Sequence, residues 1–193
     1  MNIQRPSSKQ PIPTQAKNVF KGTIFDVYQW EQDLFNGEKT IFEKLKRPDT
    51  VNIIPITPNG EIIISEQEQP GTEPFIGCLG GRLDDGEEPL KAVKRELLEE
   101  TGMEANEYIL WDATQLVDKI DWAIYTFIAK GAHKVKEQEI EAGEKIKLKH
   151  VSFDEFIQMA AQDNFRDAEV ALKIFRTMNN PAGFQEMKQL FSM

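Results

Sequence analysis

The chain has only one cysteine, Cys78, and two histidines, His133 and His150, in 193 residues. A single cysteine excludes an intramolecular disulfide, so we expect a reducing, cytoplasmic compartment. Neither histidine has a Cys or His partner at ligand spacing, so both are expected on the surface rather than at a zinc site. Cys78 lies in an apolar stretch without a neighbouring histidine, which indicates a core thiol rather than a nucleophile.

Long apolar runs and an excess of positive charge are also missing. No apolar run approaches the roughly 18 residues of a membrane span, so we expect no membrane partner. Lys and Arg total 23 against 32 Asp and Glu, and the net charge of −9 disfavours a duplex nucleic-acid surface, which needs a basic face. With 40% hydrophobic and 28% charged residues, the composition is that of a globular chain with one sizeable core.

The most informative stretch is residues 81–103, which reads Gly-Arg-Leu-Asp-Asp-Gly-Glu-Glu-Pro-Leu-Lys-Ala-Val-Lys-Arg-Glu-Leu-Leu-Glu-Glu-Thr-Gly-Met. Glu96, Glu99 and Glu100 stand at i, i+3 and i+4, so a helix places three carboxylates on one face, about 5–6 Å apart at Cβ. Like charges this close are destabilising unless a cation lies among them. Oxygen-only ligands suit a hard divalent ion such as Mg²⁺. The spacing therefore predicts a metal site.

The same stretch predicts a loop followed by a helix of about four turns. Pro89 suits the first helical turn, and Gly102 is placed to end the helix in a left-handed conformation. An apolar stripe for a core recurs at three- and four-residue intervals, formed by Leu90, Val93, Leu97 and Leu98. The helix is thus expected to be packed on one side and acidic on the other.

The rest of the chain interleaves strands and helices, which favours an α/β (α+β) fold. Asn36-Gly37 and Asn59-Gly60 are hairpin signals between strand-like segments. Strands are expected over residues 19–30, 39–45, 51–57, 61–65, 75–79, 120–129 and 145–153. Helices are expected over residues 154–161 and 166–178. The apolar run Ile62 to Ile64 indicates a strand buried on both faces.

Three regions follow from this pattern. Residues 1–17 are polar and hold three prolines, which fits neither a signal peptide nor a helix, so we expect a flexible or extended arm. Residues 18–50 form an N-terminal β extension. Residues 51–193 form the main domain with its C-terminal helices.

Residues 81–103 resemble the Nudix hydrolase signature, Gly-x5-Glu-x7-Arg-Glu-U-x-Glu-Glu-x-Gly-U, where U is apolar. Every fixed position is matched, by Gly81, Glu87, Arg95, Glu96, Leu97, Glu99, Glu100, Gly102 and Met103. The alternative is a solvated acidic helix face. The resemblance implies a Nudix-type α/β/α sandwich with a mixed sheet and, in this chain, an N-terminal β-hairpin extension.

Nudix enzymes cleave a diphosphate linked to another moiety by attack of water on phosphorus. A metal ion neutralises charge and lowers the pKa of a bound water, and the resemblance implies Mg²⁺, with Mn²⁺ as a possible substitute. It also implies Glu99 and Glu100 as direct metal ligands, Glu96 as a ligand or the base, and the backbone carbonyl of Gly80 as a further ligand.

Other roles are implied by the same resemblance. Arg95 is expected to orient the carboxylates through bidentate hydrogen bonds, and Glu87 to support the ligands rather than join them. A later acidic loop often completes a Nudix site, and Glu141 and Glu144 are its best-placed members here, from a set that includes Glu137 and Glu139. One of them is expected to enter the site, to complete it or to act as the base, and a solvated acidic loop is the alternative.

The N-terminal extension and the chain length look like the branch of ADP-ribose pyrophosphatases and nucleoside-diphosphate-sugar hydrolases, and this implies a homodimer. Two motifs differ from that branch. Gln67-Glu68-Gln69 stands where Gln-Tyr-Arg is common, and residues 77–81 read Gly-Cys-Leu-Gly-Gly instead of Glu-Leu-Pro-Ala-Gly. Arg82, beside the metal loop, is the better candidate for a phosphate contact, ahead of Arg47. Trp30 and Phe35 are expected in core or dimer contacts, with base stacking as the alternative.

We therefore expect a Mg²⁺-dependent Nudix hydrolase that cuts the pyrophosphate bond of ADP-ribose or a similar nucleotide sugar into two phosphomonoesters. Other substrates stay open, namely a dinucleoside polyphosphate, a coenzyme, a nucleoside triphosphate or capped RNA. A module that senses a nucleotide without cleaving it is the alternative of another class.

Overall fold

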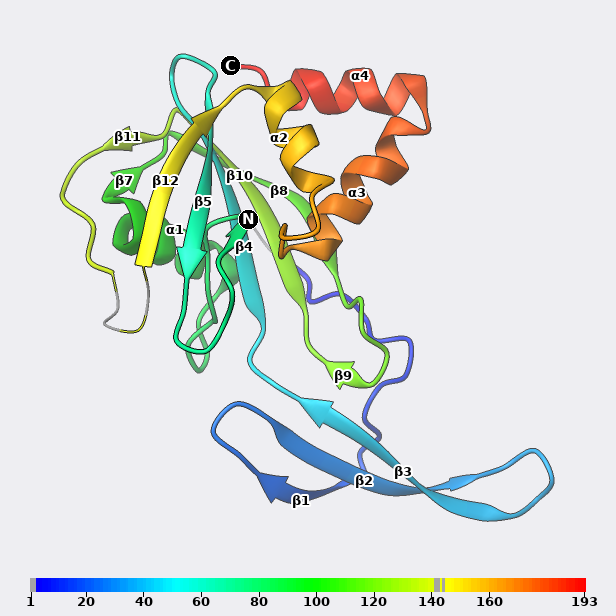
Figure 1. Ribbon diagram of the computed structural model, residues 1–193. Coiled ribbons are helices and arrows are strands. Elements are labelled where there is room, and N and C mark those ends of the chain that lie inside the picture. The colour runs from blue at the N-terminus through cyan, green and yellow to red at the C-terminus, as the bar shows by residue number, and fades with distance from the viewer. Residues whose placement is uncertain (1–2, 141–142, 144) are drawn as a thin grey trace.

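A computed structural model describes residues 3–140, 143 and 145–193 (Figure 1). The N-terminal half contains strands β1 (Lys17–Lys21), β2 (Asp26–Asp33), β3 (Lys39–Lys46), β4 (Thr50–Ile56), β5 (Ile62–Glu68) and β6 (Phe75–Gly77). Helix α1 (Pro89–Thr101) is followed by β7 (Met103–Glu104), β8 (Glu107–Thr114), β9 (Ile120–Asp121), β10 (Ile124–Lys130), β11 (His133–Lys134) and β12 (Lys145–Val151). Helices α2 (Phe153–Ala160), α3 (Ala168–Met178) and α4 (Pro181–Leu190) end the chain.

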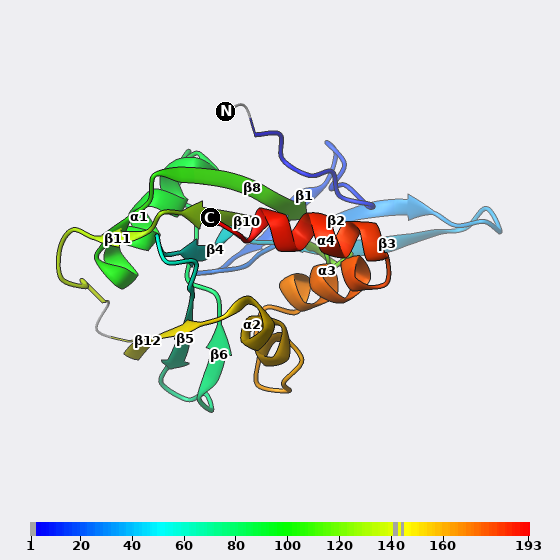
Figure 2. The same ribbon diagram turned by 90° about the horizontal axis from the view of Figure 1, so that it is seen from above.

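The main sheet is six-stranded and mixed, as expected. Its order is β12-β5-β4-β10-β8, with β6 paired to β5. Strand β10 runs parallel to β4, and the other neighbours are antiparallel. Helix α1 lies on one face and α2, α3 and α4 on the other (Figure 2), so the predicted α/β/α sandwich is confirmed.

Two apolar clusters fill the faces of this sheet. Strand parity separates them, because successive side chains of a strand point to opposite faces. Ile53 and Ile63 pack with the α1 residues Val93 and Leu97, whereas their sequence neighbours pack toward α2 and α3. Ile62, Ile63 and Ile64 are all at most 1% exposed. The predicted strand with two buried faces is therefore confirmed.

Residues 75–82 cross between two strands of the sheet. Strands β4 and β5 pair only near their shared turn, at Ile56 and Ile62, and then diverge. Gly77 pairs with Ser65 of β5, and two residues later Leu79 bridges to Ile53 of β4. We call residues 77–81 the crossover segment, and it leads directly into the loop before α1.

Helix α1 has the boundaries that the sequence predicts. Pro89 occupies its first turn, and Gly102 ends it with a φ of 68° and an N–H bond to the Leu98 carbonyl. Leu97 is fully buried, whereas Leu98 is only half-buried and Glu100 takes a buried position instead. The acidic face of the helix thus extends into the interior.

A separate four-stranded sheet is formed by β1, β2, β3 and β9 and lies beyond the end of the main sheet (Figure 1). Trp30 is buried in it against Phe42, with ring centroids 6.1 Å apart. Phe35 is fully exposed at the turn between β2 and β3. The arm before β1 is extended, and Arg5 fixes it through bonds of 2.7 and 3.0 Å to Asp49 and Asp121.

Several predicted boundaries were wrong. Residues 19–30 form two strands, because Gly22 and Phe25 close a turn through a 3.0 Å backbone bond. Residues 120–129 are likewise divided into β9 and β10, and β12 ends at Val151 rather than at residue 153. Strand β8 and helix α4 were not predicted. None of the helices in the described ranges is long and apolar enough to cross a membrane.

Replacing Leu97 with Ala tests the packing of α1. Leu97 has no exposed surface in the cluster between helix and sheet, so the loss of buried methyl groups should lower the free energy of unfolding by roughly 2–5 kcal/mol. Urea denaturation measures this change. Lys91→Ala, on the exposed side of the same helix, should change the free energy by less than about 0.5 kcal/mol. Equal effects of the two substitutions would contradict the burial of Leu97.

Candidate metal-binding active site

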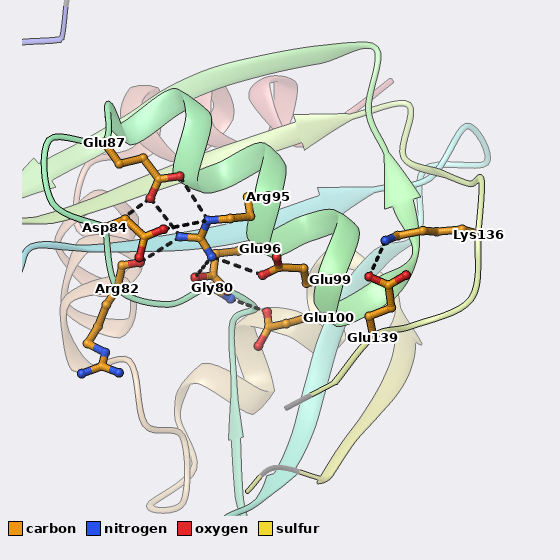
Figure 3. A network of polar contacts seen from close by, with 10 residues as sticks. All are labelled: Gly80, Arg82, Asp84, Glu87, Arg95, Glu96, Glu99, Glu100, Lys136 and Glu139. Carbon is orange, nitrogen blue, oxygen red and sulfur yellow. Dashed lines mark hydrogen bonds and ion pairs between the residues drawn. The ribbon is translucent and has the colours of Figure 1, made fainter. Parts of the chain in front are cut away.

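The Arg95 guanidinium lies at the centre of the acidic face of α1 (Figure 3). Its Nε and Nη2 donate to the two carboxylate oxygens of Glu87, at 3.1 and 2.9 Å, so the expected bidentate pair is present. Its Nη1 donates to Glu96 at 2.8 Å and to Glu99 at 3.2 Å. Nη2 also donates to the Arg82 carbonyl at 3.0 Å, which ties the preceding loop to the helix.

These bonds alter the titration of both partners. Hydrogen bonds to Glu87 are the largest of the effects that raise the pKa of Arg95, and those from Arg95 lower the pKa of Glu87. The Asp84 N–H donates to Glu87 at 3.0 Å, which also favours the charged carboxylate. Glu87 is therefore a charged anchor between the loop and Arg95.

Glu100 reaches the crossover segment. It is only 6% exposed, and its carboxylate accepts a 2.6 Å bond from the Gly80 N–H. Gly80 has a φ of 130°, and a Cβ there would overlap the Val51 carbonyl. At Gly81 a Cβ would lie 2.5 Å from a carboxylate oxygen of Glu96. Gly80 therefore requires glycine, whereas a side chain at Gly81 would displace the Glu96 carboxylate.

The donor set fits a hard divalent ion. Glu96 and Glu99 converge on one Arg95 nitrogen, and Glu100 accepts from the Gly80 N–H, so carboxylate oxygens are available on one side of the helix. As they stand, no group of three or more His, Cys, Asp or Glu side chains in the described part of the chain converges closely enough to hold a metal. Binding a metal would thus require these side chains to turn from Arg95.

The acidic loop after β11 packs against the end of α1. The Glu139 N–H donates to the Glu99 carbonyl at 2.8 Å, and Gln138 donates to the Glu100 carbonyl at 2.6 Å. The side chains of Glu137 and Glu139 pair with Lys134 and Lys136, both at 2.8 Å. The two preferred candidates for the base, Glu141 and Glu144, lie outside the described residues.

Three arginines lie near one another outside the acidic cluster. Arg47 stacks on Trp122, 4.5 Å from the ring centroid, and its buried Nε has no hydrogen-bond partner among the described residues. Burial, and then repulsion from Arg82 and Arg166, lowers the pKa of Arg47. Arg166 stacks on Phe75 at 4.4 Å. The Arg82 side chain points away from the carboxylates of α1 (Figure 3).

Two carboxylates at the start of α3, Asp167 just before the helix and Glu169 in its first turn, were not singled out from the sequence. Asp167 accepts a 2.6 Å bond from the Cys78 N–H, and Glu169 accepts a 2.5 Å bond from the Asn52 amide. No local pattern signals these contacts, because they join residues 89 and 117 positions apart. Cys78 itself is a buried thiol whose pKa is raised well above its usual value, first by burial.

The fold and the signature at residues 81–103 define a class of protein. A model of the NUDIX domain matches residues 46–173, which is more than half of the chain. The chain therefore belongs to the NUDIX domain family, and the expected class, a Nudix pyrophosphohydrolase, is confirmed.

Particular relatives support the resemblance to the ADP-ribose pyrophosphatase branch. The chain is 26% identical to "ADP-ribose pyrophosphatase" of Bacillus subtilis (strain 168) over 164 residues, 82% of this chain and 87% of the relative. It is 26% identical to "Methanol dehydrogenase activator" of Bacillus methanolicus over 166 residues, 83% and 88% of the two chains. "Crystal structure of ADP compounds hydrolase" has the same fold, with a TM-score of 0.70 at 21% identity, covering 95% of this chain and 99% of that chain.

The pair of Arg95 and Glu87 predicts a pH dependence. Because the pKa of folded Glu87 is lowered, the stability that the pair contributes is present above the unfolded pKa of about 4.3 and is lost as pH falls through the folded value. Glu87→Gln should therefore be less stable than the wild type near neutral pH, and the difference should shrink below about pH 4.

Urea denaturation across this pH range measures the effect. Glu88→Gln, a neighbouring exposed position, controls for the loss of one negative charge. A difference between Glu87→Gln and the wild type that stays constant with pH would contradict the pairing.

Proposed function

We propose that the chain hydrolyses the pyrophosphate bond of ADP-ribose or a related nucleoside diphosphate sugar with the help of a divalent metal ion. Water adds across the P–O–P linkage, so one phosphoryl group gains the hydroxyl and the other leaves as a phosphate. The products are two phosphomonoesters. The similarity to "ADP-ribose pyrophosphatase" of Bacillus subtilis (strain 168) supports this substrate class.

The observation that carries this proposal is the placement of Glu96, Glu99 and Glu100 beside the crossover segment. Their helix face is held by Arg95, and Glu100 bonds directly to the Gly80 N–H. A solvated acidic face would not need a glutamate that is only 6% exposed, nor a glycine at position 80, where any side chain would collide with the Val51 carbonyl. The arrangement favours a binding site over a surface pattern.

We propose Mg²⁺, or Mn²⁺ in its place, as the metal, held by Glu99, Glu100, the Gly80 carbonyl and Glu96. When bound, it would neutralise diphosphate charge and activate a water. The side chains of this chain do the rest of the positioning. Arg95 keeps Glu96 and Glu99 together, and Glu87 keeps Arg95 in place. We keep Glu141 and Glu144 as candidates for the base, since the described residues just before them contact the end of α1, where the Glu139 N–H donates to the Glu99 carbonyl.

The three arginines support an anionic substrate. Arg47, Arg82 and Arg166 form no ion pair within 4.0 Å among the described residues. Repulsion from the other two arginines contributes, after burial, to the lowered pKa of Arg47. Gathering cations in one place is unfavourable, and an anion bound between them would relieve the repulsion. We propose that Arg47 and Arg82 contact the diphosphate. A cytoplasmic location belongs to the same proposal and rests on the single cysteine.

Replacing Glu100 with Gln tests the proposed reaction. The amide oxygen can still accept the Gly80 bond, so the fold should persist, whereas the charge on the metal ligand is lost. Turnover of ADP-ribose with Mg²⁺ should fall by at least about a hundredfold, beyond the range for groups that only support ligands. Phosphomonoester release, followed with a coupled phosphatase, measures it. Glu104→Gln, an exposed glutamate just after α1, should keep wild-type activity.

The same assay, run with nucleotide sugars and with the other candidate substrates, separates the alternatives. Release from nucleotide sugars, absent with chelator, supports the proposal. Release only from dinucleoside polyphosphates, coenzymes, triphosphates or capped RNA would keep the chemistry and reject the substrate. Tight nucleotide binding without any turnover would favour the sensing module.

We also propose that the N-terminal sheet forms a homodimer interface. Val19, Phe20 and Ile41 are 50%, 60% and 61% exposed on this sheet. Large apolar side chains gathered on one exposed element mark interaction surfaces. A twofold dimer would bury them against the same residues of a second chain.

Ile41→Asp should convert a dimer to a monomer, because each interface would bury two unpaired charges. Sedimentation velocity measures the mass. Thr40→Asp, exposed on the opposite face of the same strand, should leave the dimer intact. A wild-type monomer, or an unchanged dimer in Ile41→Asp, would contradict the proposed interface.

A further inference from the structure

The start of α3 contacts the crossover segment and strand β4. Asp167, which precedes the helix, accepts the Cys78 N–H at 2.6 Å. Glu169, in the first turn, accepts from the Asn52 side chain of β4 at 2.5 Å. One helix end therefore binds the crossover segment and the strand beside it.

The crossover segment needs such a partner at Cys78. Gly77 pairs with β5 and Leu79 with β4, so Cys78, between them, lies where the chain changes its neighbouring strand. Side chains replace ladder bonds at this point. Asp167 accepts from the Cys78 N–H, and Ser65 donates to the Gly77 carbonyl at 2.8 Å. A buried backbone N–H without a partner is costly, so the contact with Asp167 fixes the chain here.

Gly77 makes room for the carboxylate. A Cβ at Gly77 would lie 2.9 Å from Oδ2 of Asp167, the same oxygen that accepts the Cys78 bond. The Asp167 carboxylate thus fills the volume that a side chain at position 77 would take. Position 77 and Asp167 form one packing unit.

The carboxylates are held at an electrostatic cost. Burial, and then the nearby charge of Glu169, raises the pKa of Asp167 to about 7. Burial also raises the pKa of Glu169. Burying two acids next to each other is unfavourable, which indicates that their contacts with Cys78 and Asn52 serve something besides stability.

The crossover segment connects the Asp167 contact to the acidic face of α1. Two residues after Cys78, the Gly80 N–H donates to Glu100 at 2.6 Å. On the other side, Val51 and Ile53 of β4 donate to the carbonyls of Gly81 and Leu79, at 2.9 and 2.7 Å. A shift of the segment at Cys78 would therefore move Gly80 relative to Glu100.

We propose that Asp167 is a positioning residue for the metal site, acting through the Cys78 N–H to place Gly80 beside Glu100. This inference rests on the proposed metal-dependent function. Glu169 assists by fixing Asn52 and with it β4. Asp167 touches neither substrate nor metal in this role.

Metal affinity tests the inference without relying on turnover. Mn²⁺ binding to the full chain, followed by electron paramagnetic resonance of free Mn²⁺, should weaken about tenfold to a hundredfold in Asp167→Ala. Asp167→Asn should retain most of the affinity, because the amide oxygen can accept the same bond. Ile174→Val, a buried position further along α3, controls for loss of stability and should bind Mn²⁺ like the wild type.

Gly77→Ala gives an independent variant if Asp167→Ala does not fold. Its methyl group would displace the carboxylate from Cys78 while leaving Asp167 in the chain, and Mn²⁺ binding should weaken similarly. Wild-type affinity in Gly77→Ala, or in a folded Asp167→Ala, overturns the positioning role while the wild type still binds Mn²⁺ and hydrolyses its substrate. A wild type that neither binds Mn²⁺ nor hydrolyses any diphosphate overturns the proposed function and this inference together.

Discussion

The site depends on how one guanidinium compensates the carboxylates of α1. Glu96, Glu99 and Glu100 would repel one another on a bare helix face. Arg95 donates to two of them, is held by Glu87, and bonds to the Arg82 carbonyl of the loop. The arrangement can therefore fold before any cation binds. We propose that the same arginine holds Glu96 and Glu99 on one side of the helix, from which they would turn to take a cation.

The sheet supplies the second constraint. Because β4 and β5 pair only at Ile56 and Ile62 and diverge away from that turn, the crossover segment can lie between them. It then places the Gly80 N–H beside Glu100. The opposite face contributes as well, since Asp167, the residue before α3, accepts a bond from the Cys78 N–H of this segment. Both layers of the sandwich thus determine the geometry of a site that is carried by one helix.

Local sequence signals made part of the fold and of the candidate site predictable. Helix α1 could be bounded from Pro89, Gly102 and its apolar spacing, and the strand over Ile62 to Ile64 from its unbroken apolar run. The turn at Gly22 was hidden within a stretch of high strand propensity. Strand β8 was missed because its apolar run, Tyr108 to Trp111, is short and does not alternate with polar residues. Asp167 was missed for a different reason, since its contact joins distant parts of the chain and leaves no mark in the local sequence.

The most direct test of the account is anomalous diffraction from crystals of the protein soaked in Mn²⁺. The account predicts one peak on the acidic face of α1, within ligand distance of carboxylate oxygens of Glu99 and Glu100 and of the Gly80 carbonyl. The Arg95 contact to Glu99 should be broken, and that to Glu87 kept. A fully soaked crystal without a peak there, or with its strongest peak away from α1, would contradict the assignment of these glutamates to a metal.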